Sequence, residues 1–132
     1  MNRQALIAGS LFAGIAVILG AFGAHALKEI LAADQLQVFE TGVRYQFYHS
    51  FALLIAGVVY TSFPNKNIRL AITFFIIGII LFSGSLYAMT LLTTKGISLG
   101  PIGIVTPIGG LFFILGWVFL LLGFTKKPVP VA

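Results

Sequence analysis

Four long uncharged stretches dominate the pattern of hydrophobic and polar positions along this chain. They are residues 4–27, 45–65, 70–94 and 96–125. Each stretch consists mostly of aliphatic residues, Phe, Ala and Gly, and each reaches the roughly 20 apolar residues that a helix needs to cross a bilayer. We therefore predict an all-α membrane protein with four spans. The spans are expected at about residues 5–27, 43–63, 70–92 and 106–124.

The composition supports membrane residence and leaves no room for a second domain. Hydrophobic residues make up 59% of the 132 residues and charged residues 8%, compared with about 25% charged residues in an average soluble domain. The mean hydropathy is +1.08. Because four spans and their short connections account for the whole chain, residues 1–132 are expected to form one antiparallel four-helix transmembrane bundle.

The first apolar stretch has one rival interpretation, a cleaved signal peptide. Arg3 supplies a short basic start, and Ala24-His25-Ala26 imitates a cleavage site. The apolar stretch is longer than the usual hydrophobic region of a signal peptide, however, and three further spans follow it. We therefore interpret it as the first span.

The ends of two predicted helices depend on short local signals. Asp34 followed by Gln37 is typical of a helix N-cap with its capping-box partner, so a helix is expected to start near residue 35 and to continue into the second span. The fourth span has two alternative starts, because a first helical turn tolerates proline at Pro101 or at Pro107. Thr106 is a good cap, which favours a start beside Pro107.

Lysine and arginine residues flank the spans and predict the orientation of the chain. The net charge is +5, but no nucleic-acid partner is expected, because the cations stand where lipid headgroups hold them. The amino terminus, the second connection and the carboxyl-terminal tail hold five of these cations, and the other two connections hold three. This excess predicts a multi-pass protein of the cell (inner) membrane with both termini in the cytoplasm.

Polar residues inside the spans are costly in lipid, so their positions point to a candidate site. Most of them fall at similar depths, near the face that holds the first and third connections. We expect them to form one polar pocket. Its predicted members are His25, Tyr45, Gln46, His49, Ser83, Tyr87 and Thr106.

Small residues recur at helical spacing in the predicted spans, which favours close helix packing in lipid. The packing is expected within the chain rather than between two copies. The glycines assigned to it are Gly9, Gly20, Gly23, Gly84, Gly109, Gly110 and Gly116.

Two histidines raise the alternatives of a metal site or of a haem with two axial histidines. The chain has no Cys and only 2 His, and its acids lie outside the spans, so no metal site and no cofactor are predicted. The favoured interpretation is that His25 and His49 each pair with a backbone carbonyl or a Tyr hydroxyl. Ser83 and Ser85 have no evident base, so we do not expect an enzyme.

Four ordered motifs resemble those of a known family. They are Gly20-Ala21-Phe22-Gly23-Ala24-His25, Tyr45-Gln46-Phe47-Tyr48-His49, Leu81-Phe82-Ser83-Gly84-Ser85-Leu86-Tyr87, and Thr106-Pro107-Ile108-Gly109-Gly110 with Gly116-Trp117. Together they resemble the YgdD/YwdK-type family of small bacterial inner-membrane proteins. The resemblance implies four helices and membrane residence, but it implies no mechanism.

The leading hypothesis for function is a non-enzymatic membrane component that binds a lipid, a quinone-like molecule or a larger membrane complex. Glycine-lined helix faces and one polar pocket motivate it. The alternative is an oligomeric transporter or channel for a small solute or ion, and a third interpretation is a redox carrier with two histidine ligands. The expected partners are the lipid bilayer and either further copies of the chain or a larger membrane complex.

Overall fold

The structure is a computed structural model that describes residues 1–97 and 100–130, and within these residues it is helical with no strand. Two of its segments, η1 (Gly23–Leu27) and η2 (Ile79–Ser83), are π-helical, and η3 (Ile102–Ile104) is a 3-10 turn. The elements are α1 (Arg3–Phe22), η1 (Gly23–Leu27), α2 (Lys28–Ile30), α3 (Ala33–Val59), α4 (Lys66–Gly78), η2 (Ile79–Ser83), α5 (Gly84–Thr93), η3 (Ile102–Ile104) and α6 (Val105–Phe124).

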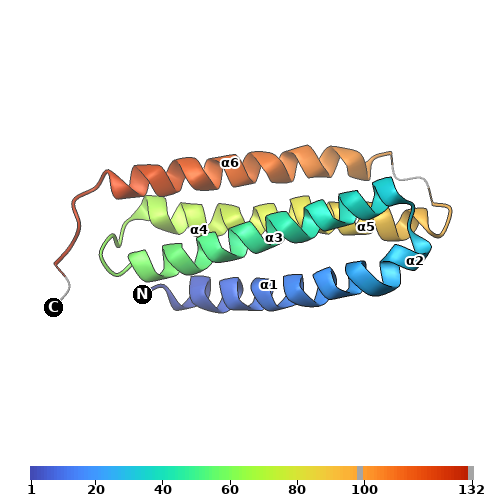
Figure 1. Cartoon of the computed structure of the whole chain (residues 1–132). Coiled ribbons are helices and arrows are strands. Elements are labelled where there is room, and N and C mark those ends of the chain that lie inside the picture. The colour runs from blue at the N-terminus through green and yellow to red at the C-terminus, as the bar shows by residue number, and fades with distance from the viewer. Residues whose placement is uncertain (98–99, 131–132) are drawn as a thin grey trace.

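These elements join into four long helical rods that lie side by side (Figure 1). The first rod is α1 with η1 and α2, the second is α3, the third is α4 with η2 and α5, and the fourth is η3 with α6. The most extensive packing is between α1 and α3 and between α4 and α6, and α3 joins the two pairs through α4, η2 and α5.

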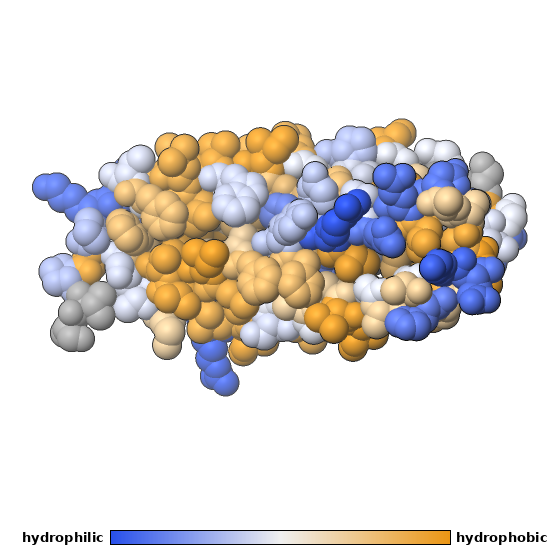
Figure 2. Space-filling model, in the orientation of Figure 1, coloured by the Kyte–Doolittle hydropathy of each residue, from blue (hydrophilic) through white to orange (hydrophobic). Residues whose placement is uncertain are grey.

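The two ends of the molecule carry different segments. The start of α1, the end of α6 and the connection from α3 to α4 lie at one end, here called the terminal end (left in Figure 1). The segment α2 and the last turn of α5 lie at the other, here called the α2 end. Figure 2 shows apolar side chains over much of the face between them, with hydrophilic ones gathered toward both ends and along part of the right-hand half.

Three of the four rods have the length and composition of membrane spans. They are Arg3–Ile30, Lys66–Thr93 and Ile102–Phe124. The rod formed by α3 is as long but less apolar, because Arg44, Gln46 and His49 interrupt its middle. Gln46 and His49 are only 2% and 5% exposed. Gln46 and His49 are therefore buried inside the protein.

Two predicted helix caps are wrong, Asp34 and Thr106. The residue that caps α3 is Ala32, which has no side-chain hydrogen bond to offer, and Asp34 lies inside the first turn. An acidic side chain there still favours the positive end of the helix dipole. The fourth rod begins before Thr106, because the 3-10 turn η3 leads directly into Val105, the first residue of α6. Pro107 then falls in the first turn, where its missing N–H costs nothing.

Close approach between rods depends on glycines, as the sequence predicts for some positions. A side chain added at Gly9, Gly23, Gly109 or Gly116 would collide with or crowd a residue of a neighbouring rod, whereas Gly20 and Gly110 have neighbours at ordinary contact distance. The assignment of Gly84 is wrong, because no neighbouring atom lies within 4 Å of an added Cβ there. Gly123, which follows Gly109 and Gly116 at steps of seven residues, is also tightly packed, and sequence reasoning missed three others, which are Gly42, Gly57 and Gly78.

Candidate functional site

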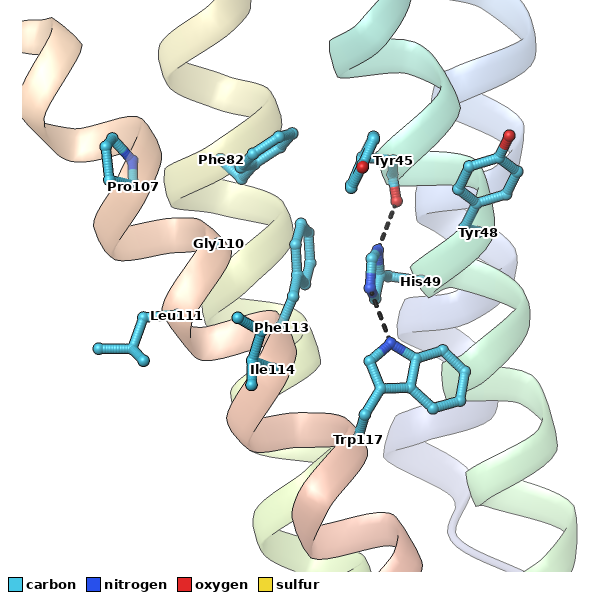
Figure 3. Close-up of a pocket in the computed structure, with 10 residues that line it drawn as sticks. All are labelled: Tyr45, Tyr48, His49, Phe82, Pro107, Gly110, Leu111, Phe113, Ile114 and Trp117. Atoms are coloured by element: carbon cyan, nitrogen blue, oxygen red, sulfur yellow. Dashed lines mark hydrogen bonds between the residues drawn. The ribbon is translucent and has the colours of Figure 1, made fainter.

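A groove of about 820 Å³ runs between α3 and α6, with Phe82 of η2 between them (Figure 3). Most of its wall is aromatic or aliphatic, and a single imidazole interrupts it. We call it the lateral groove. Its lining residues are Tyr45, Tyr48, His49, Phe82, Pro107, Gly110, Leu111, Phe113, Ile114 and Trp117.

The imidazole of His49 is held by contacts on both of its nitrogens. Its Nδ1 lies 2.7 Å from the carbonyl oxygen of Tyr45, and the indole Nε1 of Trp117 lies 3.2 Å from its Nε2. An indole N–H can only donate. Nε2 therefore accepts, and Nδ1 carries the proton and donates to Tyr45, so the ring is a neutral imidazole. Phe113 stacks on the same ring, with centroids 3.4 Å apart and planes within 5° of parallel.

The lateral groove is about half a bilayer long. Its lining on α6 runs from Pro107 to Trp117, about 15 Å at 1.5 Å per residue. The hydrocarbon core of a bilayer is about 30 Å thick. Because α6 starts at Val105, near the α2 end (Figure 1), we call the Pro107 end of the groove its shallow end and the end at the contact between His49 and Trp117 its deep end.

A second set of polar side chains, outside the lateral groove, links α3 to α1, η2 and α5. The Tyr87 hydroxyl donates to Gln46 Oε1 at 2.8 Å, and Gln46 Nε2 donates to the carbonyl of Phe12 at 2.8 Å. Ser83 donates to the carbonyl of Gly42 at 2.7 Å. Among the described residues, no buried side-chain nitrogen or oxygen lacks a hydrogen-bond partner. These groups therefore hold the rods together and offer little to a ligand.

The single polar pocket predicted from the sequence is divided in the structure. Tyr45 and His49 line the lateral groove, whereas Gln46, Ser83 and Tyr87 belong to the internal hydrogen-bond network. Successive residues of a helix point about 100° apart. Residues that share a depth therefore need not share a face, which is why equal depth did not predict a common pocket.

The other two predicted members lie elsewhere. Thr106 pairs with Ser85 at 2.6 Å between α6 and α5. His25 is exposed on η1, where its Nδ1 lies 2.9 Å from the carbonyl oxygen of Ala21. Gly23 and Leu27, one turn apart, are the buried residues of η1, and they leave the residue midway between them facing outward.

The structure does not bring the two histidines together. His49 lies against α6, while His25 is on the exposed side of the first rod. One iron could not be held between them, so the redox interpretation has no geometric basis here. Each imidazole does lie within hydrogen-bonding distance of the backbone carbonyl four residues before it.

Sequence reasoning missed most of the aromatic wall. Trp117 reads as an ordinary packing residue in mid-span, yet it is 48% exposed and closes the deep end of the lateral groove. The sequence does contain a pattern that could have indicated this wall. Steps of three and four residues lead from Gly110 through Phe113 or Ile114 to Trp117, which places these residues on one face of a helix. Only the position of α3 shows that this face borders a groove.

The fold and the lateral groove define a class, a small helical membrane protein with a groove open on its side. Comparison with known proteins identifies the group within it. A model of the family described as "Protein of unknown function (DUF423)" matches residues 19–110, and the chain belongs to this family. The resemblance to the YgdD/YwdK-type family is thereby confirmed.

Relatives named UPF0382 membrane proteins match nearly the whole chain. One from Staphylococcus aureus is 42% identical over 92% of this chain and 94% of its own length. Another from Haemophilus influenzae is 40% identical over 96% of this chain and 98% of its own. YwdK of Bacillus subtilis is 37% identical over 92% and 95%. No solved structure matches the chain.

Proposed function

We propose that this protein is a non-enzymatic, four-span component of the cell (inner) membrane that binds a lipid or a quinone-like molecule in the lateral groove. The observation that carries the proposal is the groove itself, a cavity of about 820 Å³. Ligand pockets for small molecules typically measure about 300–1,000 Å³ and have mostly apolar walls with few polar groups. The lateral groove has this size and character.

The proposal includes α3 as the fourth span of an antiparallel bundle. It has 27 residues, which is about 40 Å at 1.5 Å per residue, and it packs against α1 and against the rod of α4 and α5. Its buried polar side chains find partners inside the protein, so lipid need not solvate them. The three candidate spans that surround α3 support the same path across the bilayer for α3.

The excess of basic residues at the terminal end supports cytoplasmic termini. In that orientation the shallow end of the lateral groove faces the leaflet away from the cytoplasm. A ligand would enter sideways from that leaflet, since the groove opens between two rods rather than at an end of the molecule.

The alternative of an oligomeric transporter gains no support from the described residues. The polar side chains at similar depth motivated it, and three of them, Gln46, Ser83 and Tyr87, are engaged with one another or with backbone carbonyls. A path for a solute or an ion needs polar groups that are free to replace its water.

Native mass spectrometry from a mild detergent tests the proposal. We expect a retained adduct of lipid or quinone mass on the wild-type protein. The variant Gly110→Phe places a phenyl ring in the groove, where an added Cβ meets only the Phe82 ring at 3.8 Å or more. It should weaken ligand binding at least about tenfold, or about 1.4 kcal/mol.

The matched control is Gly14→Phe, because Gly14 is exposed on α1 and no neighbouring atom lies within 4 Å of an added Cβ. It should retain the adduct of the wild type. A wild-type protein without any adduct, or an adduct equally strong in both variants, would contradict the proposal.

A further inference from the structure

We infer that the ligand of the lateral groove is an anionic glycerophospholipid, with an acyl chain along the groove and its phosphate beside Arg44. This inference rests on the proposed function and names the ligand class. It assigns the polar part of the ligand to the shallow end and the apolar part to the deep end.

The two ends of the lateral groove differ in the polar groups they offer. At the deep end, the nitrogen atoms of His49 and Trp117 are already paired, so a ligand needs no polar atom there. At the shallow end, Tyr45 and Tyr48 are 40% and 57% exposed, and Figure 3 shows the Tyr48 hydroxyl pointing toward the end where Pro107 lies. A phenolic hydroxyl can donate to an ester or phosphate oxygen.

Tyr45 is level with the first two turns of α6. Its ring lies 4.7 Å from that of Phe82, and Phe82 packs against Gly109 and Gly110. These turns begin at Val105, so Tyr45 is level with a point about 6–8 Å along α6 from its start, at 1.5 Å per residue. Ester and phosphate groups of lipids lie at this border, where Tyr side chains are enriched.

Arg44, one residue before Tyr45, supplies a positive charge near the shallow end. It does not line the lateral groove itself but a smaller neighbouring pocket, together with Glu40 and Gly23. It is exposed, and its Nη2 lies 3.3 Å from the hydroxyl of Thr41, one turn closer to the α2 end. Long basic side chains extend in this way toward the headgroup region. Tyr48 follows Arg44 by four residues, so both lie on one face of α3. Within the described residues, Arg44 forms no ion pair, although Glu40 precedes it by one turn.

The length of the lateral groove agrees with this orientation. A groove of about 15 Å matches the hydrocarbon of one leaflet, so an acyl chain would end near Trp117 when its phosphate is at the membrane border. A quinone ring at the deep end would instead have to displace the indole of Trp117 from His49. The contacts favour the phospholipid.

The test compares lipids of equal chain length that differ in headgroup charge. Wild-type protein in mild detergent is titrated with phosphatidylglycerol, phosphatidylcholine or ubiquinone, and the adducts are measured by native mass spectrometry. We expect tighter binding of phosphatidylglycerol than of phosphatidylcholine by about fivefold, since one basic side chain near anionic lipid contributes about 1 kcal/mol.

Arg44→Ala should remove this preference while phosphatidylcholine still binds, and Arg44→Lys should restore most of it. Arg69→Ala is the matched control, because Arg69 is exposed near the start of α4, at the terminal end, and it should keep the preference. A preference that survives Arg44→Ala, or that Arg69→Ala abolishes equally, would overturn the inference.

Failure of the inference and failure of the proposed function give different results. If ubiquinone binds and phosphatidylglycerol shows no preference, the headgroup assignment is wrong and the lateral groove remains a binding site. If no titrant binds the wild type, or if Gly110→Phe binds all three as well as the wild type does, the proposed function is wrong and the inference falls with it.

Discussion

Gln46 joins three helical rods through one side chain. Its amide nitrogen donates to Phe12 of α1, its amide oxygen accepts from Tyr87 of α5, and its own backbone belongs to α3. In lipid such a group cannot turn to water, so its partners must come from the protein. The side chain therefore specifies how the first three rods are rotated relative to one another.

Replacing Gln46 with Leu should destabilise the protein by about 1–3 kcal/mol, because two interhelical hydrogen bonds are lost and the Tyr87 hydroxyl is left unpaired. Unfolding of the purified protein in mixed micelles with increasing SDS measures this loss. Tyr87→Phe is the control, since it removes only one of the two bonds and keeps the ring that packs against Phe39. A larger loss in Tyr87→Phe than in Gln46→Leu would contradict this account.

At the scale of whole helices, α6 can approach η2 closely only because Gly109 has no side chain. A Cβ added at Gly109 would overlap the backbone nitrogen of Phe82 and lie 2.7 Å from its Cα. Backbone atoms of a packed helix cannot move aside as a flexible side chain can. Gly84, in α5, differs: a Cβ added there would have no neighbouring atom within 4 Å.

Gly109→Ala should therefore lower stability by about 1–3 kcal/mol through overpacking. Gly84→Ala should leave stability unchanged or raise it by about 0.5–1 kcal/mol, since alanine is the better helix former. Thermal unfolding in detergent, followed by size-exclusion chromatography of the heated samples, distinguishes the two. Equal melting temperatures of the two variants would show that α6 does not approach η2 this closely.

Asn65 caps one helix and contacts the end of another. Its Oδ1 accepts from the backbone N–H groups of Asn67 and Ile68, and its Nδ2 donates to the carbonyl oxygens of Phe63 and Gly123 at 3.2 and 3.1 Å. The start of α4 is thereby linked to the last turn of α6.

Asn65→Ala should cost about 2 kcal/mol, about half from the lost cap and half from the lost bond to α6. Asn65→Asp keeps the acceptor of the cap but loses the donor, so an intermediate loss is expected. The same unfolding assay checks both variants. If Asn65→Asp is as stable as the wild type, the link to α6 contributes nothing.

For the whole molecule, the arrangement of rods predicts which segments share a side of the membrane. The chain has no cysteine, so single cysteines can be introduced into the natural background. Glu29, Lys95, Lys66 and Lys127 are all exposed. The first two lie toward the α2 end and the last two toward the terminal end.

In intact cells, a maleimide that cannot cross the membrane should label Glu29→Cys and Lys95→Cys, because their end is expected outside the cytoplasm. Lys66→Cys and Lys127→Cys should react only after the cells are opened. Labelling of the second pair alone would reverse the orientation and keep four spans. Labelling of Glu29→Cys without Lys95→Cys in intact cells would exclude four spans.

The sequence alone determined those features that depend on residues close together in the chain. Uncharged stretches of about 20 residues predicted the helical membrane class, and four ordered motifs indicated the family, because hydropathy and motif order need no knowledge of distant contacts. The close packing at Gly9, Gly23, Gly109 and Gly116 was predictable for the same reason, since small residues at helical spacing form one stripe.

Only the tertiary structure decided which faces of the helices meet. It paired His49 with Trp117 across 68 positions of the chain and Gln46 with Phe12 across 34, and it left His25 on the outside. The rotation of each helix about its own axis determines these contacts, and residues one position apart differ in direction by about 100°. The position of a residue along its helix follows from the sequence, whereas the lateral groove depends on how rods distant in the chain are turned toward each other.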